Sequence, residues 1–268
     1  MFRLGVASGR VHGVEVDTAF FNGNHAPEIA VQGCFLTDDN ANAVVTDPAF
    51  GGWQTILEIQ PCGPTQRQAW KLAKPTEAAY THVRLQMFPD GGIARFRLFG
   101  AAVPVFPADV EAVFDLAATV NGGVAVSCSD QHFGSAANLL LPGRGVDMGD
   151  GWETKRTRGV HVDWAIVRLG APAEIASVLV DTAHFRGNFP KEVQVFAIAV
   201  AGDVVVRHDD PAWVEILSPQ KTGPDQEHTY DTDKLKDVQG KVYTHAKLVM
   251  IPDGGIKRFR VFGKKRSL

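Results

Sequence analysis

Residues that can move protons are concentrated between positions 130 and 163 of this 268-residue chain. Carboxylates and imidazoles are the side chains that most often serve as general acids and bases. A hydrolysis uses both functions, because the attacking water loses a proton and the leaving group gains one. The acid and base candidates in this segment are Asp130, His132, Glu153, His161 and Asp163.

The same segment carries cations and an amide. Arginine presents a fork of donors that matches a carboxylate, and an asparagine amide both donates and accepts hydrogen bonds. The candidates are Arg144, Arg156, Arg158 and Asn138. In a strand, Thr154, Arg156 and Arg158 would share one face. Glu153 and Lys155 would then share the other.

Each candidate also has a structural interpretation. Two arginines on one strand face are, taken alone, more often solvated or salt-bridged than ligand-binding. Glu153 could equally be an ion-pair partner for an arginine, and for His132 the two interpretations are equally good. Trp152 and Trp164 are expected to pack in the core or at its rim.

Signals for other chemistries are weak. His161-x-Asp163 lacks a third ligand at a telling spacing, so no cofactor is predicted and a divalent metal stays open. No glycine-rich loop precedes a helix, as phosphate binding requires. No Gly-x-Ser-x-Gly or Cys/His pattern indicates a covalent nucleophile.

The composition is that of a soluble globular protein. Hydrophobic residues make up 45% and charged residues 21%, with a formal net charge of −3. No basic block or long apolar run predicts binding to nucleic acid or a membrane. Three widely spaced cysteines suit a reducing compartment, so we expect a cytoplasmic protein. The oligomeric state stays open, with a homo-oligomer among the options.

The chain repeats itself. Residues 80–100 and 243–263 are identical at 15 of 21 positions, and VDTAFFNGN at 16–24 matches VDTAHFRGN at 180–188. The motif RLG at 3–5 recurs at 168–170, and the motif Trp-x-x-Ile-Leu at 53–57 recurs at 213–217. The four pairs of segments have offsets of 160 to 165 residues. Four anchors in one order at one spacing indicate a duplication.

Each copy is predicted to be an antiparallel β-sandwich. Apolar residues alternate with arginines in FRLFG and FRVFG, and turn residues punctuate the chain throughout. Pro-Asp-Gly-Gly at 89–92 and 252–255 separates two apolar runs, which predicts a hairpin in each copy. We expect a first repeat at 1–103, a connector with one short helix at 104–120, and a second repeat at 121–268.

Residues present in both copies are expected to be structural. Asp17 and Asp181 should accept hydrogen bonds from loop N–H groups, and the Gly-Asn pairs that end at Asn24 and Asn188 should form turns. The repeated arginines should support the sheet or the repeat interface: Arg95, Arg97, Arg258 and Arg260. A site that is built once should therefore use unduplicated residues, which lie in the front section of the second repeat, residues 122–167.

The two copies differ in length. At an offset of 165, the partner of Asp150-Gly151-Trp152 falls before residue 1, so the first repeat is expected to lack its opening strands. Unpaired strand edges and uncovered apolar side chains should follow from that. We therefore predict an apolar patch or sheet edge near residues 3–20 and a first repeat that is the less stable half.

The chain resembles the allantoicase family over the run SCSDQHFGSAANLLLPGRGVDMGDGWETKRTRGVHVDWAIVRLG at 127–170. The two DT-A-x-F-x-GN segments and the two PDGGI-x-RFR segments carry the resemblance over most of the chain. The family pattern also has a DGWET-like element in its first repeat, which this sequence lacks. The resemblance implies two jelly-roll sandwiches of the galactose-binding-like type.

The resemblance also implies an activity. Family members are allantoate amidinohydrolases, which use water to break a C–N bond of allantoate and give ureidoglycolate and urea in purine (allantoin) degradation. The substrate has one carboxylate and two ureido groups, so its recognition needs a cationic fork, amide partners and an acid/base pair. Segment 130–163 offers all three. The alternatives are a non-catalytic β-sandwich that binds a small ligand or carbohydrate, and a truncated, inactive allantoicase.

Overall fold

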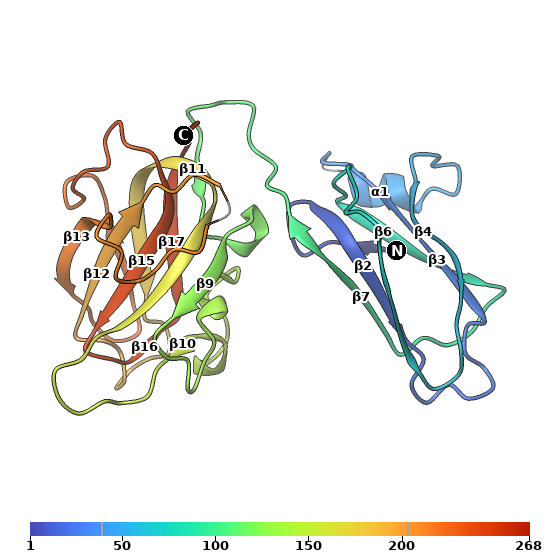
Figure 1. The fold of residues 1–268 in the computed structure, drawn as a ribbon, viewed down its shortest axis with the longest axis horizontal. Helices are drawn as coiled ribbons and strands as arrows, with labels where there is room; N and C mark the ends of the chain where they lie inside the picture. The colour runs from blue at the N-terminus through green and yellow to red at the C-terminus, as the bar shows by residue number, and fades with distance from the viewer. Residues whose placement is uncertain (39, 203) are drawn as a thin grey trace. The chain divides into compact units, whose positions relative to one another are not determined.

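The structure is a computed structural model that describes residues 1–38, 40–202 and 204–268. It divides into two compact units, Met1–Val105 and Phe106–Leu268, each with its own hydrophobic core (Figure 1). The helices of the described residues are too short to cross a membrane.

The second unit is built around one very long strand, β11 (Asp163–Asp181). Its register breaks between Arg168 and Ala173. The half before the break pairs with β9 and β15, and the half after it pairs with β14 and β17. Strands β12 and β13 extend one layer and β8 extends the other, which gives a two-layer β-sandwich.

The remaining elements of the second unit are short. The strands are β8 (Val113–Asp115), β9 (Val124–Cys128), β10 (Trp152–Glu153), β12 (Glu192–Ile198), β13 (Val214–Lys221), β14 (Glu227–Tyr230), β15 (Tyr243–Ile251), β16 (Gly255–Ile256) and β17 (Arg258–Lys265). Three 3₁₀ helices lie between β8 and β10: η1 (Thr119–Asn121), η2 (Ala136–Leu140) and η3 (Met148–Asp150).

Alternation along the strands places the core between the two layers. Trp152, Leu139 and Phe259 are fully buried there, as the tryptophan interpretation required. The buried guanidinium of Arg258 donates to the carbonyl of Gly143 (2.9 Å) and forms an ion pair with Asp150 (2.8 Å). The predicted support role of Arg258 is thus confirmed, since it ties the front section to the sheet.

The first unit has two sheets, in the orders β1-β6-β3-β4 and β5-β2-β7. Its strands are β1 (Phe2–Arg3), β2 (Gly9–Asp17), β3 (Glu28–Cys34), β4 (Gln54–Pro61), β5 (Arg67–Lys71), β6 (His82–Phe88) and β7 (Arg95–Ala102), with one helix, α1 (Ala41–Thr46). Asp17 lies opposite Arg95 just as Asp181 lies opposite Arg258. Phe20 and His184 share a positive φ of 72° and 68°. The copies therefore share backbone geometry as well as sequence.

The prediction for the aspartates is confirmed, and the prediction of two hairpins is wrong. Asp17 accepts the N–H of Ala19 (2.9 Å) and Asp181 that of Ala183 (2.8 Å). Pro-Asp-Gly-Gly, however, joins strands that are not neighbours: β11 lies between β15 and β17, and β6 and β7 belong to different sheets. Turn chemistry shows that the chain reverses there, but it does not show which strand it pairs with next.

The connector also differs from expectation. Its middle part forms the strand β8, which pairs with β17, and the short 3₁₀ helix η1 begins only at its end, at Thr119. Leu116 follows β8 and is fully buried; its N–H donates to Val261 (2.8 Å), and its carbonyl accepts from Gly170 (2.9 Å). Burial of apolar side chains against β17 thus outweighs the helical tendency of this segment.

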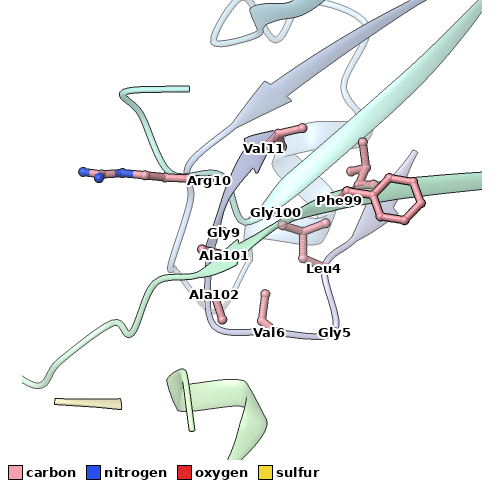
Figure 2. Close-up of a pocket in the computed structure, with 11 residues that line it drawn as sticks. Leu4, Gly5, Val6, Gly9, Arg10, Val11, Phe99, Gly100, Ala101 and Ala102 are labelled. Carbon is pink, nitrogen blue, oxygen red and sulfur yellow. The ribbon is translucent and has the colours of Figure 1, made fainter. Parts of the chain in front are cut away.

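The first unit lacks this cover. Among the described residues, β7 pairs only with β2, and residues of both strands and of the segment before β2 line an apolar hollow of about 200 Å³. Figure 2 shows Leu4 and Val6 around this hollow, with Arg10 pointing away from it. Leu98 and Gly5, the counterparts of Val261 and Gly170, also line it. The predicted apolar patch near residues 3–20 is therefore present.

Candidate functional site

Four loops of the second unit meet around an open cavity of about 240 Å³. They are the loop before β10, the loop after β10, the loop that ends the DT-A-x-F-x-GN segment, and the Pro-Asp-Gly-Gly loop. The lining residues are Phe133, Glu153, Thr154, Arg156, Gly187, Asn188, Phe189, Asp253 and Gly254. Two carboxylates, a guanidinium and an amide thus share one cavity with two aromatic rings.

Strand β10 aims Glu153 at the cavity. Trp152 is fully buried, and its indole N–H donates to the carbonyl of Asp130 (2.8 Å). Successive side chains of a strand point in opposite directions, so the anchored tryptophan turns Glu153 outward. The backbone of Glu153 bridges to Gly134, and its Oε1 accepts a hydrogen bond from Nδ2 of Asn188 (2.5 Å).

The Pro-Asp-Gly-Gly loop holds the opposite wall. Gly254 has a φ of 143°, a conformation that a side chain would strain. The N–H of Gly255 donates to the carbonyl of Asn188 (2.7 Å). Asp253 accepts the N–H of Thr157 through Oδ2 (2.8 Å) and so fixes the loop that carries Arg156.

Residues 154–158 form a loop rather than the predicted strand. Thr154 is buried, and its N–H donates to the carbonyl of Gly254 (3.0 Å). This contact ends β10 at Glu153, because the backbone bonds to the opposite loop instead of to a neighbouring strand. Arg156 lines the cavity, whereas Arg158 is exposed outside it. The predicted pairing of the two arginines on one face is therefore wrong.

Asp130 and His132 lie behind the cavity wall. Both the N–H of His132 (3.1 Å) and the N–H of Lys155 (2.9 Å) donate to Oδ2 of Asp130. This carboxylate thus clamps the two front loops together. The exposed imidazole of His132 meets the ring of Phe133 edge-on, with the centroids 4.5 Å apart. Phe133, and not His132, lines the cavity.

His161 and Asp163 form a second, separate pair. Nε2 of His161 lies 3.1 Å from Oδ1 of Asp163, which also accepts the hydroxyl of Ser129 (2.6 Å). The Asp163 side chain is buried at the start of β11, and its Oδ2 has no hydrogen-bond partner. Both residues lie outside the cavity lining.

Arg144 and Asn138 make internal contacts. Arg144 binds the buried carboxylate of Asp181 with two hydrogen bonds (2.8 and 2.9 Å), and these bonds raise its pKa above the ordinary value. The amide of Asn138 donates to the carbonyl of Gly151 (2.9 Å). Both side chains therefore hold the front section in place. Of the catalytic and substrate-binding residues predicted from the sequence, only Glu153 and Arg156 line the cavity.

Sequence reasoning missed Asn188, Asp253, Phe133 and Phe189. The first two are duplicated, with Asn24 and Asp90 as counterparts, and duplication was taken to mean a purely structural role. No signal in the sequence could have identified these two, because they meet Glu153 and Thr157 only in the folded chain, across 35 and 96 residues.

The described residues contain no group of three or more His, Cys, Asp or Glu side chains arranged to hold a metal ion. The cavity itself offers two carboxylates, from Glu153 and Asp253. Each already accepts a hydrogen bond from the protein.

Comparison with known proteins matches the whole length of both repeats to one family. A family model described as the allantoicase repeat matches residues 1–103 and 114–266. An allantoicase of Neurospora crassa is 59% identical over 266 residues, which cover 99% of this chain and 74% of that protein. An allantoicase of Saccharomyces cerevisiae is 46% identical, covering 98% of this chain and 75% of that protein.

The fold agrees with the sequence comparison. The crystal structure of the Saccharomyces cerevisiae allantoicase matches with a TM-score of 0.74 and 46% identity. The match covers 97% of this chain and 75% of the crystallised one. The prediction of two repeats with an all-β sandwich fold is confirmed by the strand topology and by this match.

Proposed function

The chain belongs to the allantoicase family and hydrolyses a C–N bond of allantoate, and we propose that the reaction takes place in the cavity around Glu153. The products are ureidoglycolate and urea, in purine degradation. One observation carries the assignment of the cavity: Glu153, Arg156 and Asn188 line the same open space. They supply a proton acceptor, a cation for the carboxylate and an amide for a ureido group.

Glu153 is the general base in this proposal. Its Oε1 accepts the hydrogen bond from Asn188, so Oε2 is the oxygen that takes the proton from a water in the cavity. The water oxygen bonds to the central carbon of allantoate as the C–N bond to one ureido group breaks. The proton taken from water is then returned to the leaving nitrogen, so that urea departs as a neutral molecule and the hydroxyl stays on the carbon of ureidoglycolate.

Arg156 binds the substrate carboxylate. Its guanidinium is exposed at the cavity and can present two parallel N–H donors. Asp253 fixes the loop beneath it through the N–H of Thr157, so that the cation stays at the cavity edge. Phe133 and Phe189 provide apolar walls that reduce the access of water.

The test is a urea-release assay on purified variants. Glu153→Gln and Arg156→Ala should each lower kcat/KM for allantoate at least about tenfold, or about 1.4 kcal/mol of transition-state binding. Glu153→Gln should act mainly on kcat, because it removes the base. Arg156→Ala should act mainly on KM, because it removes the carboxylate partner.

Arg158→Ala is the matched control, since Arg158 lies two residues from Arg156 but outside the cavity. It should keep full activity. Thermal unfolding of all three variants should resemble that of the parent chain. Full activity in both Glu153→Gln and Arg156→Ala would place the reaction elsewhere in the molecule.

A further inference from the structure

Asn24 and Asn188 occupy the same place in the two repeats, and their backbone carbonyls accept equivalent hydrogen bonds. The carbonyl of Asn188 accepts the N–H of Gly255 (2.7 Å), and that of Asn24 accepts the N–H of Gly92 (2.7 Å). Each bond joins the end of the DT-A-x-F-x-GN segment to the Pro-Asp-Gly-Gly loop. This shared contact depends on the main chain and places no demand on the side-chain amide.

The side chains of the two asparagines do different things. Asn188 is half-buried, and its Nδ2 donates to Oε1 of Glu153 (2.5 Å). Asn24 is exposed on the first unit. Within the residues that the structure describes, the Asn24 side chain makes no hydrogen bond to a carboxylate. Of the two amides, only that of Asn188 therefore meets a carboxylate that faces a cavity.

We propose that Asn188 is a positioning residue for Glu153 in allantoate hydrolysis, whereas Asn24 serves only its turn. The inference rests on the proposed function, because it takes Glu153 as the base. A donor on Oε1 holds the carboxylate in one orientation and leaves Oε2 available to a water in the cavity.

The other charged groups near Glu153 come from the neighbouring loops. Arg156 and Asp253 line the same cavity, Lys155 is two residues from Glu153, and Asp130 bonds to the N–H of Lys155. His132 lies beside the cavity residue Phe133. All of these groups remain when Asn188 is replaced, so a change in kcat would report the loss of the amide.

The experiment compares Asn188→Ala with Asn24→Ala in the full chain, with urea release from allantoate measured at neutral pH. Asn188→Ala should lower kcat/KM about tenfold, with a fall in kcat and less than a twofold change in KM. Asn188→Asp lacks the amide donor and should lower kcat at least as much, whereas Asn24→Ala should leave kcat and KM unchanged.

A double variant separates this inference from the proposed function. In a Glu153→Gln background, Asn188→Ala should cost less than about twofold, because its effect runs through the missing carboxylate. An unchanged kcat in Asn188→Ala, or a rise in KM alone, would overturn the positioning role and leave Glu153 as the base. Full activity of Glu153→Gln itself would instead overturn the proposed function.

Discussion

Replacing Arg144 by Ala should destabilise the second unit without weakening substrate binding. The Asp181 side chain is 1% exposed, and two hydrogen bonds from Arg144 neutralise it. Without the arginine, the carboxylate still accepts the hydrogen bond from the N–H of Ala183 (2.8 Å). Arg258 also still lies opposite Asp181 on β17. It loses the ion pair that compensates for its burial.

The cost follows from the exposure of the two partners. Removing one member of a fully buried ion pair costs about 3–5 kcal/mol. The Arg144 side chain is 51% exposed, so water screens the pair and reduces that figure. With Ala183 and Arg258 still in place, we expect a loss of about 2 kcal/mol, or about 4–8 °C in melting temperature for a unit of this size.

Urea unfolding and steady-state kinetics test this expectation together. Asp181→Asn should relieve most of the penalty, so the double variant should be less destabilised than the sum of the single ones. Asp17→Asn is the control, since its aspartate is only half-buried, and it should cost less than about 0.5 kcal/mol. An unchanged unfolding free energy in Arg144→Ala, or an equal loss with and without Asp181, would refute the reasoning. A tenfold rise in KM at full stability would show that Arg144 binds substrate.

Two further predictions concern stability. Burial lowers the pKa of His82 and His245, and a neighbouring arginine lowers each further. The unfolded chain therefore binds protons that the folded chain does not, and stability should fall as the pH drops below about 6.5. His245→Asn should flatten this slope in urea unfolding, and an equal slope in parent and variant would contradict the assignment. In hydrogen exchange, the amide of Gly170, bonded to Leu116, should be protected while that of Gly5 exchanges freely; equal protection would mean that the first unit covers its edge in another way.

The duplication and the strand content were readable from the sequence because both are local. Alternation of apolar residues with arginines requires no knowledge of neighbouring strands, and repeated segments must fold alike. The capping role of Asp17 and Asp181 was predictable for the same reason. Each carboxylate accepts the N–H of the residue two positions later, so chain geometry alone brings donor and acceptor together.

Strand order and the cavity needed the tertiary structure, because both depend on contacts distant in sequence. The Pro-Asp-Gly-Gly turn was visible, but only the packed sandwich shows that the chain crosses β11 there instead of forming a hairpin. Asn188 lies 35 residues from Glu153, and Asp253 lies 96 from Thr157. In the sequence Asn188 is indistinguishable in role from Asn24. Folding gives it a carboxylate partner, because hydrogen bonding depends on distance in space, which sequence spacing does not fix.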